Sequence, residues 1–257
     1  MKLFIGIPSA GSPTAPFLES LAALKLPEQI TAIGRATVTG NFPPAQREVI
    51  VRKALASDAD LVLMLDDDMV LPPDALVRLF DTLYATEHAA LAGALYYSRD
   101  GTRPMVASGW TSADTTTAWI PAFRDDGPVA VDAIGFGCVL IRTTAFAALL
   151  RPYFQAQIYI EQHASRVRVC NEDFLFCERL RKAGFSVMLD GSVRCGHFDR
   201  QSGVVVPLSW ETNDQSDLRR VFIAGPGPAY ALVPYDEAIP RSHEDHERVT
   251  LDYLYVE

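Results

Sequence analysis

Short apolar runs alternate with amphipathic segments through residues 1–97, and this alternation constrains the fold more than any other feature. The amphipathic segments carry apolar residues three and four positions apart, as helices do, and we expect helices from about Pro16, after Pro44 and from Pro72. A repeated strand–helix–strand order predicts an α/β fold with a mainly parallel central sheet. The expected strands are LFIGIP, QITAIGRAT, LVLML and AALAGALYY.

The second half of the chain continues this pattern after an interruption. Residues 98–128 are rich in turn formers and predict a long irregular excursion, after which VDAIGFGCVLI resumes the sheet. A helix and a strand follow in NEDFLFCERLRKAGFSVML. We therefore predict one domain over residues 1–200, with halves 1–97 and 98–200, and a C-terminal extension over 201–257.

Composition excludes several classes of function. The net charge of −9 and the scattered Lys and Arg residues make nucleic acid an improbable partner. No apolar run approaches the roughly 20 residues that span a bilayer, and the N-terminal run is too short for a signal peptide. The cysteines lack C-x-x-C spacing, so we expect reduced thiols in a cytoplasmic protein. They are Cys138, Cys170, Cys177 and Cys195.

Three consecutive carboxylates, Asp66, Asp67 and Asp68, follow the apolar run 61–65. Ligands of open α/β sheets bind beyond the carboxyl ends of strands, which is where this triplet is expected. Adjacent carboxylates repel one another unless a cation lies among them. The triplet is either a solvated turn that caps the next helix or a site for Mg²⁺ or Mn²⁺, which prefer hard oxygen ligands. Its position after a buried strand favours the metal.

A second acidic motif opens the helix at residues 171–185. Helical spacing places Asp173 on the apolar face that carries Phe176, Cys177 and Leu180. Capping explains acidic residues at a helix start but not one that faces inward, so Asp173 is a candidate general base. Glu172 is expected to point elsewhere, toward an acceptor or a backbone cap.

His197 follows the next predicted strand. A lone histidine is more often structural than a ligand, but here it joins two acidic motifs. Together these features resemble the GT-A fold of nucleotide-sugar-dependent glycosyltransferases, in particular the family 2-like group of bacterial and phage enzymes. The matching segments cover about residues 1–97 and 129–199. They are LFIGIPS, DADLVLMLDDDMVLPPDALVRL, VDAIGFGCVLIRTTAF, NEDFLFCERLRKAGFSVMLD and CGHFD.

The resemblance implies a DXD motif made by Asp66 and Asp68, which contacts the ribose and a metal-bound diphosphate. It implies Mn²⁺ or Mg²⁺ as the cofactor, with Asp68, Asp66 and His197 as ligands and Asp67 in the donor site. Asp173, or else Glu172, becomes the catalytic carboxylate. Residues 1–97 become the nucleotide-binding half and 98–200 the acceptor and catalytic half.

The resemblance also implies nucleotide contacts at Pro8 and Ser9 and places Gly135 and Gly137 where donor sugar and acceptor meet. Trp110 lies in the irregular segment beside the expected cleft, where it either stacks on a sugar or packs as an ordinary loop residue. Many relatives carry Ala-Arg-Asn before the DXD strand, and the aligned residues here are Gln46, Arg47 and Glu48. Arg47 keeps the arginine and is expected to reach a phosphate, whereas Glu48 departs from the pattern.

The predicted function is metal-dependent transfer of a sugar from a nucleoside diphosphate sugar, with UDP favoured, to an acceptor hydroxyl, with inversion or retention left open. One alternative is a nucleotidyltransferase, which the absence of Lys and Arg from PSAGSPTAP disfavours. A non-catalytic sugar-nucleotide-binding module and a transferase acting on DNA bases are the others. The extension matches nothing in the family, and Trp210 and Phe222 within it are candidates for a lid.

Overall fold

The computed structural model describes the chain except residues 102, 114–127, 162–165, 207–232, 235–248 and 251–257. Trp210 and Phe222 lie outside the described residues. None of the described helices is long and apolar enough to cross a membrane.

The N-terminal part of the chain forms a parallel three-stranded unit with helical crossovers. Strand β1 (Lys2–Ser9) pairs in parallel with β2 (Ala32–Thr39) on one side and with β3 (Leu61–Leu65) on the other. Helix α1 (Ala15–Ala22) connects β1 to β2, and α2 (Pro43–Ala56) connects β2 to β3. All three strands therefore end at the same edge of the sheet.

The full sheet has seven strands in the order β2-β1-β3-β9-β5-β12-β7. Strands β5 (Ala89–Leu95) and β12 (Ser186–Arg194) are parallel to each other. Strand β9 (Cys138–Arg142) runs antiparallel to its neighbours β3 and β5. At the edge of the sheet, β7 (Pro128–Val131) runs antiparallel to β12. Five strands, β2, β1, β3, β5 and β12, thus share one direction. This confirms the predicted α/β fold with a mainly parallel sheet.

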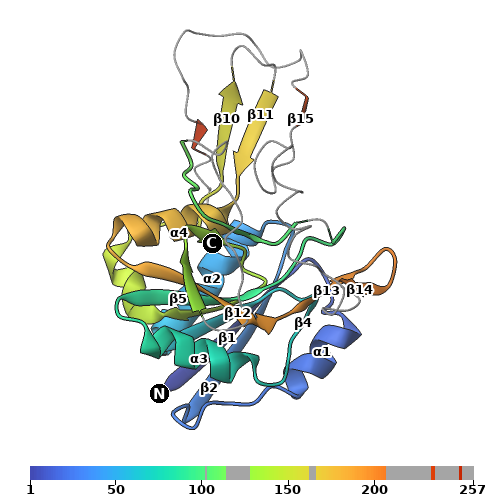
Figure 1. Cartoon of the computed structure of the whole chain (residues 1–257), viewed down its shortest axis with the longest axis vertical. Coiled ribbons are helices and arrows are strands. Elements are labelled where there is room, and N and C mark those ends of the chain that lie inside the picture. Colours follow the sequence, from blue (N-terminus) through green and yellow to red (C-terminus); the bar gives the residue numbers. More distant parts are fainter. Residues whose placement is uncertain (102, 114–127, 162–165, 207–232, 235–248, 251–257) are drawn as a thin grey trace.

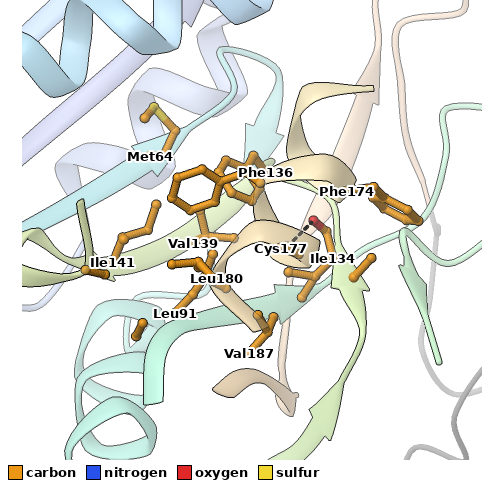
Figure 2. Packing of buried hydrophobic residues seen from close by; sticks show 14 of the residues in the cluster. Met64, Leu91, Ile134, Phe136, Val139, Ile141, Phe174, Cys177, Leu180 and Val187 are labelled. Atoms are coloured by element: carbon orange, nitrogen blue, oxygen red, sulfur yellow. Dashed lines mark hydrogen bonds between the residues drawn. The ribbon is translucent and has the colours of Figure 1, made fainter. Parts of the chain in front are cut away.

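Helices cover both faces of the sheet (Figure 1). One core cluster joins the sheet to α2 and α4 (Glu172–Lys182), and the other joins it to α1 and α3 (Ala75–Ala85). In the first cluster, the inward face of α4 packs on the sheet, as Figure 2 shows for Cys177 and Leu180. Burying both faces of a sheet in this way explains why its strands read as nearly continuous apolar runs.

Helix α3 begins three residues later than the sequence predicts. Pro72 precedes Pro73, and a residue before proline is disfavoured in the helical region. The helix therefore starts at Ala75 with Asp74 as its N-cap, and the Asp74 side chain makes no capping hydrogen bond. The Asp74 carboxylate instead forms an ion pair of 2.8 Å with Arg78 one turn later.

A small three-stranded sheet borders the acidic triplet. Strand β13 (Gly196–Asp199) lies between β4 (Met69–Val70) and β14 (Val204–Val206), antiparallel to both. Because β4 follows Asp68 and β13 contains His197, this sheet brings the two residues together. Strand β14 lies beyond residue 200, and the predicted domain boundary there stays a prediction.

The remaining elements lie toward the side of α4. Short strands β6 (Val106–Ala107) and β8 (Ala133–Ile134) pair with each other, and a 3-10 helix, η1 (Thr143–Ala148), follows β9. The hairpin of β10 (Gln157–Glu161) and β11 (Arg166–Cys170) extends away from the central sheet (Figure 1). Strands β16 (Val249–Thr250) and β15 (Val233–Pro234) flank this hairpin.

Candidate functional site

A polar pocket of about 240 Å³ lies at the carboxyl ends of β1, β2 and β3 and at the start of α2. This edge is where ligands of open α/β sheets bind. The pocket contains every residue predicted for the nucleotide side of the donor site. Its lining is Pro8, Ser9, Ala10, Gly40, Asn41, Pro43, Gln46, Arg47, Asp66, Asp67, Asp68 and Arg99.

Asp66, the first carboxylate of the triplet, belongs to a charged network that extends into the core. The Arg47 side chain donates from Nη2 to Asp66 Oδ1 at 2.9 Å and from Nε to Glu172 Oε1 at 3.0 Å. Arg47 and Glu172 are both buried. The pKa of Arg47 is raised because, although burial lowers it, the carboxylates of Asp66, Glu172 and Asp173 outweigh burial. Arg47 therefore remains charged and fixes Asp66 and Glu172 relative to each other.

Asp67 connects the triplet to the loop after β1. Its Oδ2 accepts a hydrogen bond of 2.5 Å from Ser9 Oγ, and its Oδ1 lies 2.9 Å from Arg200 Nη2. The backbone carbonyl of Asp67 accepts from both the N–H and the hydroxyl of Thr14, the N-cap of α1. Both carboxylate oxygens have protein partners, so Asp67 acts here mainly to hold the pocket wall in place.

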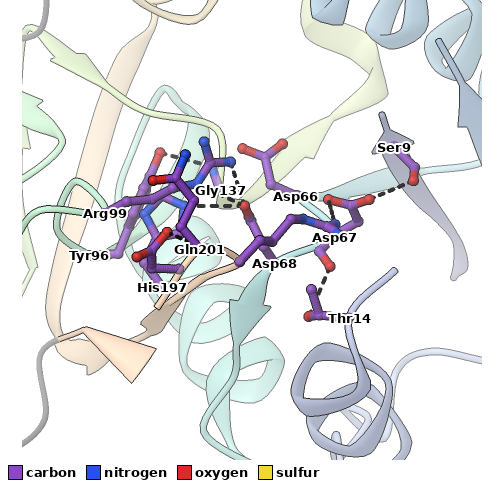
Figure 3. A network of polar contacts seen from close by, with 12 residues as sticks. Ser9, Thr14, Asp66, Asp67, Asp68, Tyr96, Arg99, Gly137, His197 and Gln201 are labelled. Atoms are coloured by element: carbon purple, nitrogen blue, oxygen red, sulfur yellow. Dashed lines mark hydrogen bonds and ion pairs between the residues drawn. The ribbon is translucent and has the colours of Figure 1, made fainter. Parts of the chain in front are cut away.

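Asp68 meets a histidine and an arginine at one oxygen (Figure 3). Arg99 approaches Asp68 Oδ2 with Nη2 at 2.5 Å and Nε at 3.2 Å, and His197 Nε2 lies 3.5 Å away. The Asp68 side chain is only 2% exposed. Burial raises the pKa of the Asp68 carboxyl, but His197 and Arg99 outweigh burial and the pKa is lowered. Asp68 is therefore ionised at neutral pH.

The orientation of His197 suits a cation shared with Asp68. His197 Nδ1 lies 2.8 Å from the carbonyl oxygen of Tyr97, and since a carbonyl only accepts, Nδ1 carries a proton. His197 Nε2 lies 3.5 Å from Asp68 Oδ2, and when it carries no proton its lone pair is available to a cation beside that oxygen. Two electron-pair donors that converge in this way fit a divalent cation between them.

The described residues contain no group of three or more His, Cys, Asp or Glu arranged to hold a metal ion. If a divalent cation binds at this edge, Asp68 and His197 are the residues placed to hold it, and Mg²⁺ commonly takes its remaining ligands from phosphate and water. The assignment of Asp66 as a third ligand stays a prediction, because its carboxylate is held by Arg47.

Asp173 faces inward at the start of α4, as helical spacing predicts, with Phe176, Cys177 and Leu180 on the same buried face. Burial, followed by the neighbouring charge of Glu172, raises the pKa of Asp173 to about 7. The Phe174 N–H donates to Asp173 Oδ1 at 2.8 Å. A carboxyl group with this pKa is able to exchange a proton near neutral pH.

The two glycines predicted to contact the sugar lie against Tyr96. A Cβ atom at Gly135 would lie 2.1 Å from the Tyr96 hydroxyl oxygen, and one at Gly137 would lie 2.8 Å from Tyr96 Cζ. Gly137 donates its N–H to that hydroxyl, and its carbonyl accepts from Asp66 N–H. The glycines thus give Tyr96 room beneath the triplet, and their contact with a sugar stays a prediction.

Trp110 is the residue for which the sequence left two interpretations open. Its side chain is fully buried and packs edge-to-face on Phe174, with ring centroids 5.3 Å apart. The Trp110 ring thus lies within the core in this structure, and its contact with a sugar stays a prediction. The alternative interpretation, ordinary packing, is the one the structure favours, because the short pairing of β6 and β8 holds the preceding segment against the core.

Gln46 and Glu48, on either side of Arg47, have structural roles. Gln46 Nε2 donates to the carbonyl oxygens of Ser9 at 2.8 Å and Val38 at 2.6 Å, and so joins the ends of β1 and β2. Glu48 is buried and accepts from the backbone N–H of Tyr153 at 2.8 Å. Glu48 therefore holds the segment after η1 against α2.

Sequence reasoning missed Arg99 and Arg200 as partners of the triplet. Arg200 directly follows the GHFD segment, and Arg99 follows the end of β5, but neither position carries a pattern that names its partner. It also missed Gly40 and Asn41, which line the pocket just after β2. The rule that ligands bind beyond the carboxyl ends of strands could have found these two.

The mainly parallel seven-stranded sheet with helices on both faces is an α/β architecture of the GT-A type. Among solved structures, the chain is similar to A197 from STIV, with a TM-score of 0.57, 16% identity, and coverage of 96% of this chain and 100% of that one. No protein-family model and no curated protein sequence matches the chain.

Two glycosyltransferases are also among the similar structures. One is GalNAc-T7 with UDP, GalNAc and Mn²⁺, with a TM-score of 0.48, 12% identity, and coverage of 77% of this chain and 44% of that one. The other is S. aureus TarS 1–349 in complex with UDP-GlcNAc, with a TM-score of 0.44, 12% identity, and coverage of 76% of this chain and 56% of that one. The chain thus spans about half the length of each of these two.

Proposed function

We propose that the chain is a glycosyltransferase that moves a sugar from a nucleoside diphosphate sugar to an acceptor hydroxyl. The observation that carries this proposal is that Ser9 and the triplet Asp66–Asp68 line one pocket, with Asp68 beside His197. This arrangement gives a GT-A sheet edge the groups to bind a nucleotide and to neutralise a diphosphate. UDP-sugars are the donors we favour, since they are the most common donors of the family that the sequence resembles.

The nucleoside would occupy the part of the pocket between Ser9 and the loop of Gly40 and Asn41. Its diphosphate would lie toward Asp68, on the side of the pocket that Arg99 lines. A bound Mn²⁺ or Mg²⁺ would neutralise charge on the departing nucleoside diphosphate. Asp68 and His197 are the residues placed to hold it.

Asp173 is the better candidate for the base than Glu172. The Glu172 carboxylate is committed to Arg47, whereas the Asp173 carboxyl has a pKa of about 7 and can take up a proton near neutrality. In an inverting reaction, the oxygen of the acceptor hydroxyl would bond to the anomeric carbon while Asp173 accepts the hydroxyl proton. The bond between the anomeric carbon and the diphosphate oxygen would break in the same step. In a retaining reaction, Asp173 would position the acceptor instead.

The cytoplasm is the location we propose, and this proposal rests on the sequence, in which the cysteines lack C-x-x-C spacing. In the structure, all four cysteines are buried and free.

Donor hydrolysis tests this function without knowledge of the acceptor. Purified protein is incubated with Mn²⁺ and UDP-, GDP- or dTDP-hexoses, and the released sugar is quantified. We expect wild type to release sugar slowly from one donor class. If Asp173 acts as a base, Asp173→Asn should lower the rate of release by about 10²–10⁴. The surface variant Asp74→Asn should release sugar at the wild-type rate. Binding of a donor without release of sugar would favour a non-catalytic module. If the protein neither binds a donor nor releases sugar from it, the proposal is refuted.

A further inference from the structure

Three arginines from distant parts of the chain neutralise the three carboxylates of the triplet. They differ in burial, because the Arg47 side chain is 5% exposed, that of Arg200 is 42% exposed and that of Arg99 is 58% exposed. The pairs are Asp66 with Arg47 at 2.9 Å, Asp67 with Arg200 at 2.9 Å and Asp68 with Arg99 at 2.5 Å. Arg99 therefore combines the shortest ion pair with the most exposed guanidinium.

The backbone under Arg99 is well fixed, although its side chain is exposed. In the turn after β5, Ser98 N–H donates to the Arg103 carbonyl at 2.7 Å, and Gly101 N–H donates to the Ser98 carbonyl at 2.8 Å. Ser98 Oγ also donates to Asp100 Oδ1 at 2.5 Å. The turn thus holds the Arg99 Cα atom beside the pocket, and the side chain alone reaches across to Asp68.

Asp68 Oδ2 is crowded by its two partners. Arg99 directs two N–H groups at this oxygen, and His197 Nε2 approaches the same oxygen. A divalent cation between Asp68 and His197 would meet the Arg99 guanidinium at close range and be repelled by its positive charge. Such a cation and Arg99 therefore compete for one carboxylate.

We propose that Arg99 is a positioning residue of the donor site: it neutralises Asp68 before the donor arrives, and it transfers to the donor's diphosphate when a divalent cation binds Asp68. This inference rests on the proposed function. The guanidinium fork matches the oxygens of a phosphate as well as those of a carboxylate, so the same side chain serves both partners. The half-exposed Arg99 regains water when it leaves, and the arriving cation takes its place in neutralising the buried Asp68 carboxylate.

The other two arginines are less suited to this exchange. Arg47 is buried between Asp66 and Glu172, and its departure would leave both carboxylates without their charge partner. Arg200 Nη1 also donates to the Ser12 carbonyl at 2.9 Å, so Arg200 fastens the β13–β14 connection to the loop after β1. Arg99 remains the arginine whose side chain can turn within the pocket.

Two titrations test the exchange, with Arg99→Gln, Arg99→Lys and the matched control Arg103→Gln. Arg103 is an exposed arginine of the same turn whose side chain makes no ion pair or hydrogen bond with the described residues. Mn²⁺ alone is titrated by electron paramagnetic resonance, and UDP, GDP, dTDP, ADP and CDP are titrated by calorimetry in saturating Mn²⁺. Circular dichroism verifies that each variant is folded.

We expect Arg99→Gln to bind Mn²⁺ alone about fivefold more tightly than wild type, because the competing cation is gone. In Mn²⁺, it should bind the preferred nucleoside diphosphate about tenfold more weakly, since a charged phosphate contact is lost. Arg99→Lys should bind this nucleotide with intermediate affinity, and Arg103→Gln should match wild type in both titrations.

The proposal is overturned if Arg99→Gln binds Mn²⁺ no more tightly than wild type, or if it binds the nucleotide as well as wild type does. These results would leave the proposed function intact, because wild type would still bind the nucleotide. If wild type binds none of the nucleoside diphosphates, the proposed function fails and the proposal falls with it.

Discussion

We predict that the substitution Asp173→Asn raises the free energy of unfolding by an amount that depends on pH. The pKa of Asp173 is raised from 3.8 to about 7 in the folded protein, first by burial and then by Glu172. Between these two values the unfolded chain has released the proton that the folded protein still binds, so stability falls as pH rises. Asn is nearly isosteric and can accept the Phe174 N–H, but it has no proton to release. The variant therefore escapes this loss.

The magnitude follows from the size of the shift. One pKa unit corresponds to about 1.4 kcal/mol, so a shift of 7 − 3.8, about 3 units, gives a loss of about 4 kcal/mol between pH 4 and pH 7. This figure is an upper bound, because water entering the site on ionisation reduces the cost of the buried charge. Above pH 7 the difference between variant and wild type should be constant.

Urea unfolding followed by circular dichroism at pH 5, 6, 7 and 8 measures this difference. The free energy of unfolding of Asp173→Asn minus that of wild type should rise steadily from pH 5 to pH 7 and then level off. Asp74→Asn, which removes only a surface ion pair, serves as the control and should change stability by less than about 1 kcal/mol at each pH. A difference that is the same at pH 5 and pH 8 would refute the raised pKa and with it the argument for Asp173 as a base.

Two further predictions concern the framework of the site. Arg47→Met should destabilise the protein by about 3–5 kcal/mol in urea unfolding, because Asp66 and Glu172 lose their charge partner, and adding Glu172→Gln should restore part of the loss. A loss below about 1 kcal/mol would contradict this role. Gly135→Ala should lower stability by about 1–3 kcal/mol, since the new Cβ would meet the Tyr96 hydroxyl, and Tyr96→Phe should recover part of it. If the double variant is no more stable than Gly135→Ala, crowding against that hydroxyl is not the cause.

The fold was predictable because its main determinants are local. The run 61–65 is fully apolar and fully buried, and the parallel pairing of β3 with β1 places Asp66–Asp68 and Ser9 at one sheet edge. Helical spacing likewise predicted the inward direction of Asp173. A continuous apolar run marks a strand that is buried on both faces, and the period of 3.6 residues decides which side of a helix faces the core.

The charge partners of the acidic residues in the site were not predictable, because they come from distant segments without any periodic pattern. Arg47 and Glu172 are 125 residues apart in sequence, and Arg99 and Asp68 are 31 apart. For Trp110 the sequence left stacking and packing both open, because an irregular segment gives no sign of which face is buried. Pairings of this kind depend on the assembled fold rather than on the residues that flank them.

Thermal unfolding of wild type and Asp68→Asn tests the central claim most directly. Each protein is heated with and without Mn²⁺ in the presence of UDP, GDP, dTDP, ADP or CDP. We predict that one nucleotide stabilises wild type only when Mn²⁺ is present, by about 2.7 kcal/mol at a concentration 100 times Kd, and that Asp68→Asn does not respond. If no nucleotide shifts the transition, or if Asp68→Asn responds as wild type does, the triplet is not a metal–diphosphate site and the account is wrong.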